Sequence, residues 1–523
     1  MSTRSKVFNT STFLFLFAAL AFLYYFLFIP PFLPTQGSSW DSLLYLAPGQ
    51  RMYQGEMIYR NVFEFVTPGT ALVNFLMFKL FGLRLWIPDL LALLLGSGLA
   101  FLGVVISRQI MRTGLALLPS AVFLVSARGF LCDATHHWYS VLAAIAAVAV
   151  LLEKRTPGRI AVAGLLCGLS ASFTQTRGLA VAVGFTVFLW WESRQRREGW
   201  HALLRIEMWL LAGCFSAFLA VNAYFIWEAG PTRYFWCTVV YVLKYYPKLT
   251  SANTFQVISE EFPVYISFRT FLHPFAQWLF LSAFIPIVYL LFFARYWRER
   301  RRKRVEYWER PMLVAIVGFF MLLSIAPAPD YVRMMASMLP PLILLTWLLD
   351  SPNKLARAGV VALTVVTMLI GIWSVEARRP HPVGILTTPE GDLAFTEADA
   401  YKEDLWIRQH TQPSEYFYEA AYSDVYFYLD LRNPTPLPFV ENDGYTTPEQ
   451  VTEVIRGLEQ HQVRYVLWSP QVLDIVQTWE NPSDAHLGPL REYICSHYSL
   501  VKVFPDADEI WEKKTNWRAV TPF

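Results

Sequence analysis

Three arginines stand out because each lies in a short connection between two apolar segments. They are Arg128, Arg177 and Arg333. A guanidinium group keeps its charge and can bind a phosphate group through two parallel hydrogen bonds. If the three connections lie on one side of a membrane, these residues predict a shared anion site. The simpler alternative is that each side chain extends to the phosphates of nearby lipids.

One aspartate could act as a general base beside these cations. Asp41 follows the first apolar run and is preceded by Trp40. A carboxylate that is held at a membrane surface, partly removed from water, can accept a proton from a reacting hydroxyl. Asp41 could equally cap a helix that begins at Ser42, and the spacing alone favours this capping role.

A second group of polar residues begins at Asp133, which is followed closely by His136 and His137. An aspartate with two histidines is a combination that binds metal ions. Adjacent histidines rarely point at one ion, however, so we favour helix capping and assign no metal ligands here. A requirement for a divalent metal remains open. We expect two further carboxylates, Glu56 and Glu64, to be solvated.

The composition is that of an integral membrane protein. Of the 523 residues, 55% are hydrophobic and 16% are charged, against about 25% charged residues in an ordinary soluble domain. This excludes a disordered chain and argues against a soluble globule. The basic residues form short clusters between apolar runs, so we expect no nucleic-acid partner.

About eleven charge-poor segments are candidates to cross a bilayer, which requires about 20 residues in a helix. They lie at about residues 12–33, 90–107, 113–132, 134–152, 160–176, 178–191, 208–227, 274–294, 311–329, 334–349 and 358–375. We therefore predict a multi-pass α-helical membrane domain over residues 1–375, with longer loops at about 34–85 and 228–273.

The basic loops predict the orientation of this domain, because loops rich in lysine and arginine stay in the cytoplasm. Residues 68–83 are apolar but short, and we expect them to form a helix on the outer surface. The N-terminus then lies in the cytoplasm, and the domain lies in the inner (plasma) membrane. We expect a cytoplasmic location also for the loops that begin at Arg108, Lys154, Arg194, Arg295 and Lys354.

The C-terminal residues 376–523 differ in charge from the rest of the chain. They contain 12 basic and 24 acidic residues, whereas residues 1–375 contain 32 basic and 17 acidic residues. Strand-like runs at 416–422, 424–431 and 463–469 alternate with a helical pattern at 448–461. We predict a soluble α/β domain on the periplasmic side.

The order of these features resembles the GT-C superfamily of membrane glycosyltransferases, which take sugars from polyprenyl phosphates. The bacterial branch related to protein O-mannosyltransferases and lipid A aminoarabinose transferase is the most similar. The features that carry the resemblance are Trp40-Asp41, the tyrosines and glycine of the following loop (Tyr45, Tyr53, Gly55, Tyr59), the RNVFEFVTPG run, Asp133, Arg177-Gly178 and YVRMMASMLPPLILL. The likeness covers about residues 1–350.

The resemblance implies inverting transfer of a hexosyl or pentosyl group at the outer face of the membrane. Asp41 would be the general base, and Asp133 would support it or bind the acceptor. Arg177, Arg333 and, less centrally, Arg128 would hold the phosphate of the donor. We assign contacts with the acceptor, a protein, lipid or glycan, to Tyr45, Tyr59, Glu64, His136 and His137.

Three other functions remain open at this point. A transporter of lipid-linked sugars would have a similar number of spans, but such proteins often contain inverted repeats, and the sequence has no visible repeat. A ligase that joins whole envelope glycans would use the same donors in a wider cleft. A third alternative is an inactive scaffold whose C-terminal domain binds a partner.

Overall fold

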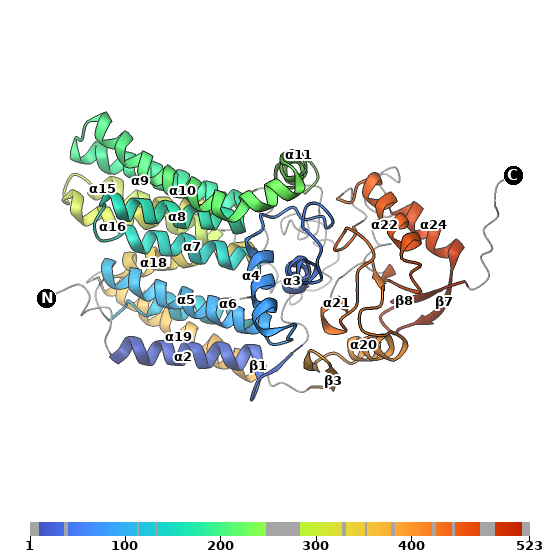
Figure 1. The fold of residues 1–523 in the computed structure, drawn as a ribbon. Helices are drawn as coiled ribbons and strands as arrows, with labels where there is room; N and C mark the ends of the chain where they lie inside the picture. Colours follow the sequence, from blue (N-terminus) through green and yellow to red (C-terminus); the bar gives the residue numbers. More distant parts are fainter. Residues whose placement is uncertain are drawn as a thin grey trace.

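The computed structural model describes two regions, a helical bundle and a C-terminal α/β region (Figure 1). The described residues are 10–35, 40–111, 114–131, 133–246, 283–326, 331–350, 353–377, 382–420, 425–441, 445–470 and 487–514. The bundle contains the long helices, which run side by side. The C-terminal region lies beyond one end of the bundle, which we call the near end; the opposite end is the far end.

Every predicted apolar segment contains a helix. The bundle helices are α2 (Thr10–Leu27), α5 (Ile87–Ile110), α6 (Leu118–Leu131), α7 (His136–Leu151), α8 (Pro157–Phe173), α9 (Gln175–Arg196), α10 (Trp200–Ala229), α15 (Ile285–Glu299), α16 (Val305–Leu323), α18 (Leu339–Leu349) and α19 (Lys354–Ala377). Among the described helices, α2, α5, α10 and α19 are long and apolar enough to cross a membrane by length and composition. Parts of the predicted segments 113–132, 274–294 and 311–329 lie outside the described residues.

Small residues allow two of these helices to pack closely. A Cβ added at Gly164 would lie 2.1 Å from the carbonyl oxygen of Leu210, and one at Gly168 would lie 2.1 Å from that of Cys214. Helices that associate in lipid gain from such close backbone approach, because burial against lipid tails supplies little driving force. The glycines therefore fix the pairing of α8 with α10, which forms one side of the bundle.

The predicted cytoplasmic loops meet one another at the far end. Arg310 donates hydrogen bonds to the carbonyl oxygens of Gln109 (2.8 Å) and Leu152 (3.2 Å). Arg295 donates to the carbonyl oxygen of Leu348 at 3.4 Å. These contacts place the loops after α5, α7, α15 and α18 together, as the orientation rule requires. Which side of a membrane they face stays a prediction.

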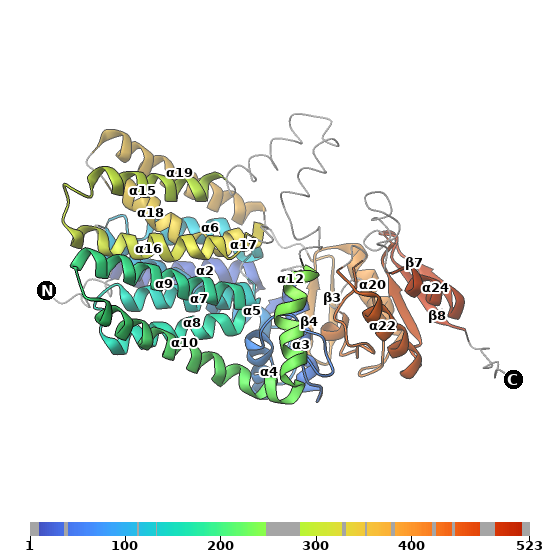
Figure 2. The ribbon, with the colours of Figure 1, turned by 90° about the horizontal axis from the view of Figure 1, so that it is seen from above.

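Short helices cross the near end of the bundle. These are α3 (Trp40–Tyr53), α4 (Gly69–Phe81), α11 (Pro231–Phe235), the π-helix η1 (Trp236–Tyr241), α12 (Val242–Lys244) and the short α17 (Tyr331–Ala336). In Figure 2, α3, α4 and the α11–α12 segment run across the direction of the bundle helices and separate them from the C-terminal region. The helix expected over residues 68–83 is α4, which lies in this crossing layer.

The C-terminal region combines a hairpin with a mixed sheet. Strands β3 (Gly384–Thr388) and β4 (Gly391–Phe395) form the antiparallel hairpin. The sheet has the order β5-β6-β8-β7, in which β5 pairs parallel with β6 and the other pairs are antiparallel. Its members are β5 (Tyr418–Glu419), β6 (Tyr465–Trp468), β7 (Tyr498–Val503) and β8 (Glu509–Lys513), accompanied by α20 (Ala398–His410), α21 (Val425–Tyr428), α22 (Pro448–Gln460) and α24 (Gly488–His497).

One strand expected in this region is a helix instead. Residues 425–428, within the strand-like run at 424–431, form the one-turn helix α21. Its backbone is engaged by a distant segment, because the carbonyl oxygen of Tyr426 accepts from Gln50 at 2.8 Å. The Tyr426 hydroxyl accepts from the amide of the nearby Glu419 at 2.9 Å. These tertiary contacts outweigh the intrinsic preference of aromatic residues for strands.

The C-terminal region is attached to the crossing layer through backbone and side-chain contacts. Arg51 of α3 donates to the carbonyl oxygen of Thr435 at 2.6 Å, and the amide of Phe63 donates to that of Pro436 at 2.8 Å. Thr35 forms a parallel bridge with Ala394. It directly follows a short hairpin of β1 (Phe28–Ile29) and β2 (Leu33–Pro34). The crossing layer is thus enclosed between the bundle and the C-terminal region.

Candidate active site

Two arginines from helices far apart in the sequence meet at one histidine at the near end. Nη1 of Arg177 donates to the carbonyl oxygen of His137 at 2.9 Å. Nε of Arg333 lies 3.5 Å from Nε2 of the same His137. The rings of His136 and His137 are 3.8 Å apart at their centroids. We call Arg177, Arg333, His136 and His137 the arginine–histidine cluster.

The corner between α8 and α9 holds Arg177 in this position. Arg177 is only 1% exposed and also donates to Oγ of Ser140 at 3.0 Å. The next residue, Gly178, packs against α8 so closely that a Cβ there would lie 2.2 Å from the amide nitrogen of Ala171. This explains the Arg-Gly pair physically. Arg177 is buried within the protein, so it does not extend to lipid phosphates.

The first turn of α7 is fixed by the same corner. Oγ1 of Thr174 donates to the carbonyl oxygen of His136 at 3.1 Å. The Tyr45 ring packs edge-on against His136 with centroids 4.3 Å apart. Asp133 is 3% exposed, and its Oδ1 accepts from the amide of Thr135 at 3.2 Å. The structure therefore brings Asp133, Tyr45 and both histidines to the same end as the arginines.

The loop that follows α3 carries a buried carboxyl group. Glu64 is 7% exposed, and its Oε1 accepts from the amide of Val66 at 2.9 Å. Burial raises the pKa of Glu64 to about 7, and the amides of Val66 and Phe65 oppose this shift. The expectation that Glu64 is solvated is wrong, because the loop folds inward between the bundle and the C-terminal region. Glu56 instead is partly exposed and pairs with Arg51 at 2.5 Å.

Gln175 connects this loop to the α8–α9 corner. Its Nε2 donates to the carbonyl oxygens of Phe65 (3.0 Å) and Thr238 (2.9 Å). Oγ1 of Thr67 donates to the carbonyl oxygen of Ala171 at 2.8 Å. The loop with Glu64, the π-helix η1 and the residues before Arg177 are therefore held together as one unit.

Two tyrosines that the sequence analysis did not select lie near Arg333: Tyr246 contacts it, and Tyr445 packs against Tyr246. The hydroxyl of Tyr246 accepts a hydrogen bond from Nη2 of Arg333. The Tyr246 ring lies 5.2 Å from that of Phe65 and 6.4 Å from that of Tyr445. Tyr445 belongs to the C-terminal region, and its carbonyl oxygen accepts from Tyr241 at 2.8 Å. Only the three-dimensional fold could reveal Tyr445, because no motif surrounds it.

Three predicted site residues require separate comment. Asp41 is the second residue of α3, one turn before Tyr45, so the helix begins at Trp40 rather than at Ser42. Arg128 belongs to the last turn of α6. The side chains of Asp41 and Arg128 lie outside the described residues. Tyr59 is fully buried, and its hydroxyl donates to the carbonyl oxygen of Val66 at 2.6 Å, which fixes the loop that contains Glu64.

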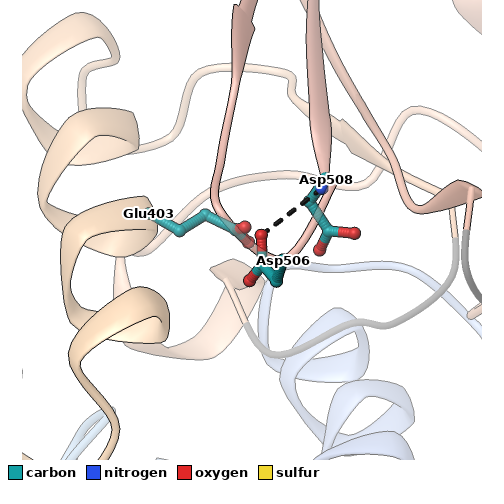
Figure 3. A group of neighbouring side chains, drawn as sticks. All are labelled: Glu403, Asp506 and Asp508. Carbon is teal, nitrogen blue, oxygen red and sulfur yellow. Dashed lines mark hydrogen bonds between the residues drawn. The ribbon is translucent and has the colours of Figure 1, made fainter.

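A group of carboxylates in the C-terminal region could approach a cation. Figure 3 shows Glu403 of α20 facing Asp506 and Asp508 of the β7–β8 connection, with carboxylate oxygens within 4.8 Å of one another. The hydroxyl of Ser469 donates to Asp508, and the amide of Asp508 donates to Asp506 at 3.4 Å. The three residues are partly exposed. Because acidic surface clusters commonly occur without a metal, this one does not by itself indicate a metal site.

Comparison with known proteins identifies the fold through structure rather than sequence. No protein-family model matches the chain, and no curated protein matches it in sequence. ArnT from Cupriavidus metallidurans bound to undecaprenyl phosphate is similar over 97% of this chain and 98% of its own, with a TM-score of 0.56 and 13% identity. Its apo form gives a TM-score of 0.57 at 13% identity, over 96% of this chain and 97% of its own.

A weaker likeness extends to an archaeal protein. The oligosaccharyltransferase of Archaeoglobus fulgidus has a TM-score of 0.46 and 12% identity over 87% of this chain and 67% of its own. The similarity to ArnT includes both the bundle and the C-terminal region, because it covers nearly the whole of both chains. At this level the chain has the fold of the two ArnT structures, a helical bundle followed by an α/β region.

Proposed function

We propose that the protein is a membrane glycosyltransferase that moves a sugar from a polyprenyl phosphate to an acceptor hydroxyl. The observation that carries this proposal is the arginine–histidine cluster, in which two guanidinium groups from distant helices converge on His137. The GT-C fold is consistent with this chemistry, and the ArnT structure of the same fold is bound to undecaprenyl phosphate.

In this proposal Arg177 and Arg333 hold the phosphate of the donor, with Arg128 as a further contact. The acceptor oxygen attacks C1 of the sugar, and the bond between C1 and the phosphate oxygen breaks with inversion at C1. The electron pair of that bond leaves with the polyprenyl phosphate. A phosphate monoester is a stable anion, so its departure needs fixed positive charge rather than a proton donor.

Asp41 is the proposed general base. It takes the proton of the acceptor hydroxyl as the new bond to C1 forms. Its position in α3 supports this role, since it lies one helical turn before Tyr45, whose ring contacts His136. Asp133, just before α7, is the proposed supporting carboxylate.

The acceptor is proposed to bind among Tyr45, Glu64, His136 and His137. Aromatic rings suit the C–H faces of sugars, and the histidines and Glu64 supply hydrogen-bonding groups. For Tyr59 we now propose a positioning role, because its hydroxyl is engaged by the Val66 carbonyl. The bundle is proposed to span the inner membrane with the near end and the C-terminal region on the periplasmic side.

The experiment that tests this function starts from the purified full-length protein. Lipid that co-purifies is extracted, and its sugar is identified by mass spectrometry. That lipid then serves as donor, and release of polyprenyl phosphate is followed in the presence of envelope extract as acceptor source. We expect Asp41→Asn to abolish release while the donor still binds. The control is Asp392→Asn, which makes the same isosteric change at an exposed position of the β3–β4 hairpin.

Two outcomes would overturn the proposal. Unchanged release by Asp41→Asn would remove Asp41 as the base. Movement of an intact lipid-linked sugar across a vesicle membrane, without release of polyprenyl phosphate, would identify a transporter instead. Release that joins a whole oligosaccharide to the acceptor would retain the transferase class but change the donor to a glycan.

A further inference from the structure

A second basic site lies at the far end of the bundle, away from the arginine–histidine cluster. A pocket of about 230 Å³ opens between the C-terminal end of α9, the C-terminal end of α15 and the start of α16. Figures 1 and 2 show this corner at the opposite end of the bundle from the C-terminal region. The pocket is lined by Trp191, Gln195, Tyr296, Arg300, Arg301, Lys303, Val305 and Trp308.

The lining carries three positive charges and no carboxylate. Arg300, Arg301 and Lys303 are exposed on the turn between α15 and α16. Within the described part of the chain, none of them forms an ion pair. A cavity with this lining attracts an anion.

Three acidic residues of this corner are already paired with other arginines. Glu309 accepts from Arg196 at 2.8 Å and lies 3.5 Å from Arg155. Glu192 lies 3.0 Å from Arg196 and 3.4 Å from Arg155. Glu299 pairs with Arg295 at 3.3 Å. These carboxylates therefore do not neutralise the cations of the pocket.

The wall of the pocket is aromatic. Trp308 is 1% exposed, and its indole N–H has no acceptor among the described residues. Tyr296 is 8% exposed, and its hydroxyl accepts from Nε1 of Trp191 at 3.1 Å. A buried donor without a partner is costly, but the Nε1 atom is itself buried, so what Trp308 presents to the pocket is its ring.

We propose that this pocket binds the phosphate headgroup of an anionic membrane lipid, such as phosphatidylglycerol or cardiolipin. The cations would hold the phosphate, and the acyl chains would lie along the apolar surfaces of α15 and α9. Basic pockets between helices at the cytoplasmic surface bind such headgroups, and tryptophan and tyrosine favour that depth. The pocket is open, so the acyl chains can extend to the bilayer.

The test measures lipid binding by the intact protein with native mass spectrometry in detergent. Phosphatidylglycerol, cardiolipin and zwitterionic phosphatidylethanolamine are added separately. The variant R300A/R301A/K303A removes the cations of the pocket. The matched control R298A/R302A/R304A removes three arginines of the same segment that do not line the pocket. Inorganic phosphate serves as a soluble competitor, which separates a lipid headgroup from a free anion.

We expect both anionic lipids to bind the wild-type protein and the control variant, and the pocket variant to bind at least about tenfold more weakly. Arg301→Ala removes a single cation from the lining and should weaken binding about threefold. This milder variant tests the pocket if the triple variant does not fold. Equal losses in the two triple variants would indicate diffuse attraction and overturn the proposal. Displacement of the lipid by millimolar phosphate, or equal binding of phosphatidylethanolamine, would also overturn it.

Discussion

The two ends of the helical bundle hold buried arginines in different ways. At the near end, the described hydrogen bonds of Arg177 go to a backbone carbonyl and a serine hydroxyl. At the far end, Arg155 lies between the carboxylates of Glu192 and Glu309 at 3.4 and 3.5 Å. The described contacts of Arg177 orient its guanidinium group, whereas those of Arg155 pair its charge with two carboxylates.

This difference separates a position suited to chemistry from one suited to stability. A fixed guanidinium that is oriented by neutral groups can stabilise negative charge that develops on a substrate. The charge of a guanidinium that is paired with carboxylates is already compensated. Here such pairs join the start of α8, the end of α9 and the start of α16. The comparison can be tested by changing one arginine at a time.

The largest effect is expected from Arg155→Ala at the far end. Its side chain is 8% exposed, and its removal leaves Glu192, 7% exposed, with one cation fewer. Loss of one partner of a buried ion pair costs about 3–5 kcal/mol of unfolding free energy. The measurement is thermal and denaturant unfolding in detergent, with transferase activity per folded molecule followed in parallel.

The control for this variant is Arg159→Ala in the first turn of α8. Arg159 pairs with Glu153 at 2.5 Å, but both side chains are more than a third exposed (39% and 37%), and such a pair contributes at most about 1 kcal/mol. We expect unchanged activity per folded molecule in both variants. An Arg155→Ala protein as stable as Arg159→Ala would show that the far-end network does not hold the fold together.

Arg177→Ala should affect transferase activity rather than stability, the opposite of what we expect for Arg155→Ala. Because Arg177 is proposed to bind the departing phosphate, its removal should lower the rate of polyprenyl phosphate release by about 10²- to 10³-fold. Arg177→Lys keeps the charge but not the planar pair of donors, and should recover part of the rate. The assay is release from the co-purified donor. Arg194→Ala, at an exposed position of the same helix, should leave the rate unchanged.

A rate for Arg177→Ala within a factor of three of wild type, at equal folding, would contradict the proposed difference between the ends. A rate loss accompanied by an equal loss of stability, not recovered by Arg177→Lys, would instead make Arg177 a structural residue like Arg155.

The sequence was sufficient to predict where the apolar helices lie and that Arg177 and Arg333 lie close together, for a physical reason. Apolar runs of about 20 residues identify helices in a membrane without knowledge of their partners. Each of the eleven predicted segments contains a helix, and the structure brings Arg177 and Arg333 to the same histidine. Charge placed against the orientation rule was the informative signal, because it is costly unless it has a use.

Features that depend on contacts between distant segments could not be predicted. Glu64 is buried because the C-terminal region covers its loop, and the hydrogen bond from Phe63 to Pro436 spans most of the chain. The ring of Tyr445 packs against that of Tyr246, although no recognisable motif surrounds Tyr445. The short helix α21 replaces a strand for the same reason. Local pattern carries no information about these contacts.

Glu64 extends the comparison of the two ends from arginines to carboxyl groups. It is buried at the near end and has no ion pair among the described residues. Burial raises its pKa from the ordinary 4.5 to about 7. The folded protein thus keeps this proton up to about pH 7, and unfolding free energy falls as pH rises from about 4.5 to 7. Above pH 7 the ionised carboxylate costs about 3 kcal/mol, since one pKa unit corresponds to about 1.4 kcal/mol.

Glu64→Gln should remove this pH dependence. We expect the variant to unfold at a higher temperature than wild type at pH 8 and at nearly the same temperature at pH 4.5, which serves as the internal control. Thermal unfolding of both proteins across that range is the measurement. A constant difference between them at all pH values would mean that the carboxyl does not change its charge in this window.

The smallest effect is expected from Arg51→Ala, which combines both kinds of contact at the near end. Arg51 pairs with Glu56 and also donates to the Thr435 carbonyl across the contact with the C-terminal region. Loss of a hydrogen bond from a charged group costs about 1.5–3 kcal/mol. It should appear as faster hydrogen exchange around Thr435. Arg60→Ala, which breaks an exposed pair with Glu228, is the control and should leave exchange there unchanged. If Arg51→Ala also leaves it unchanged, the C-terminal region is held by its backbone contacts alone, and neutral acceptors at the near end only orient arginines.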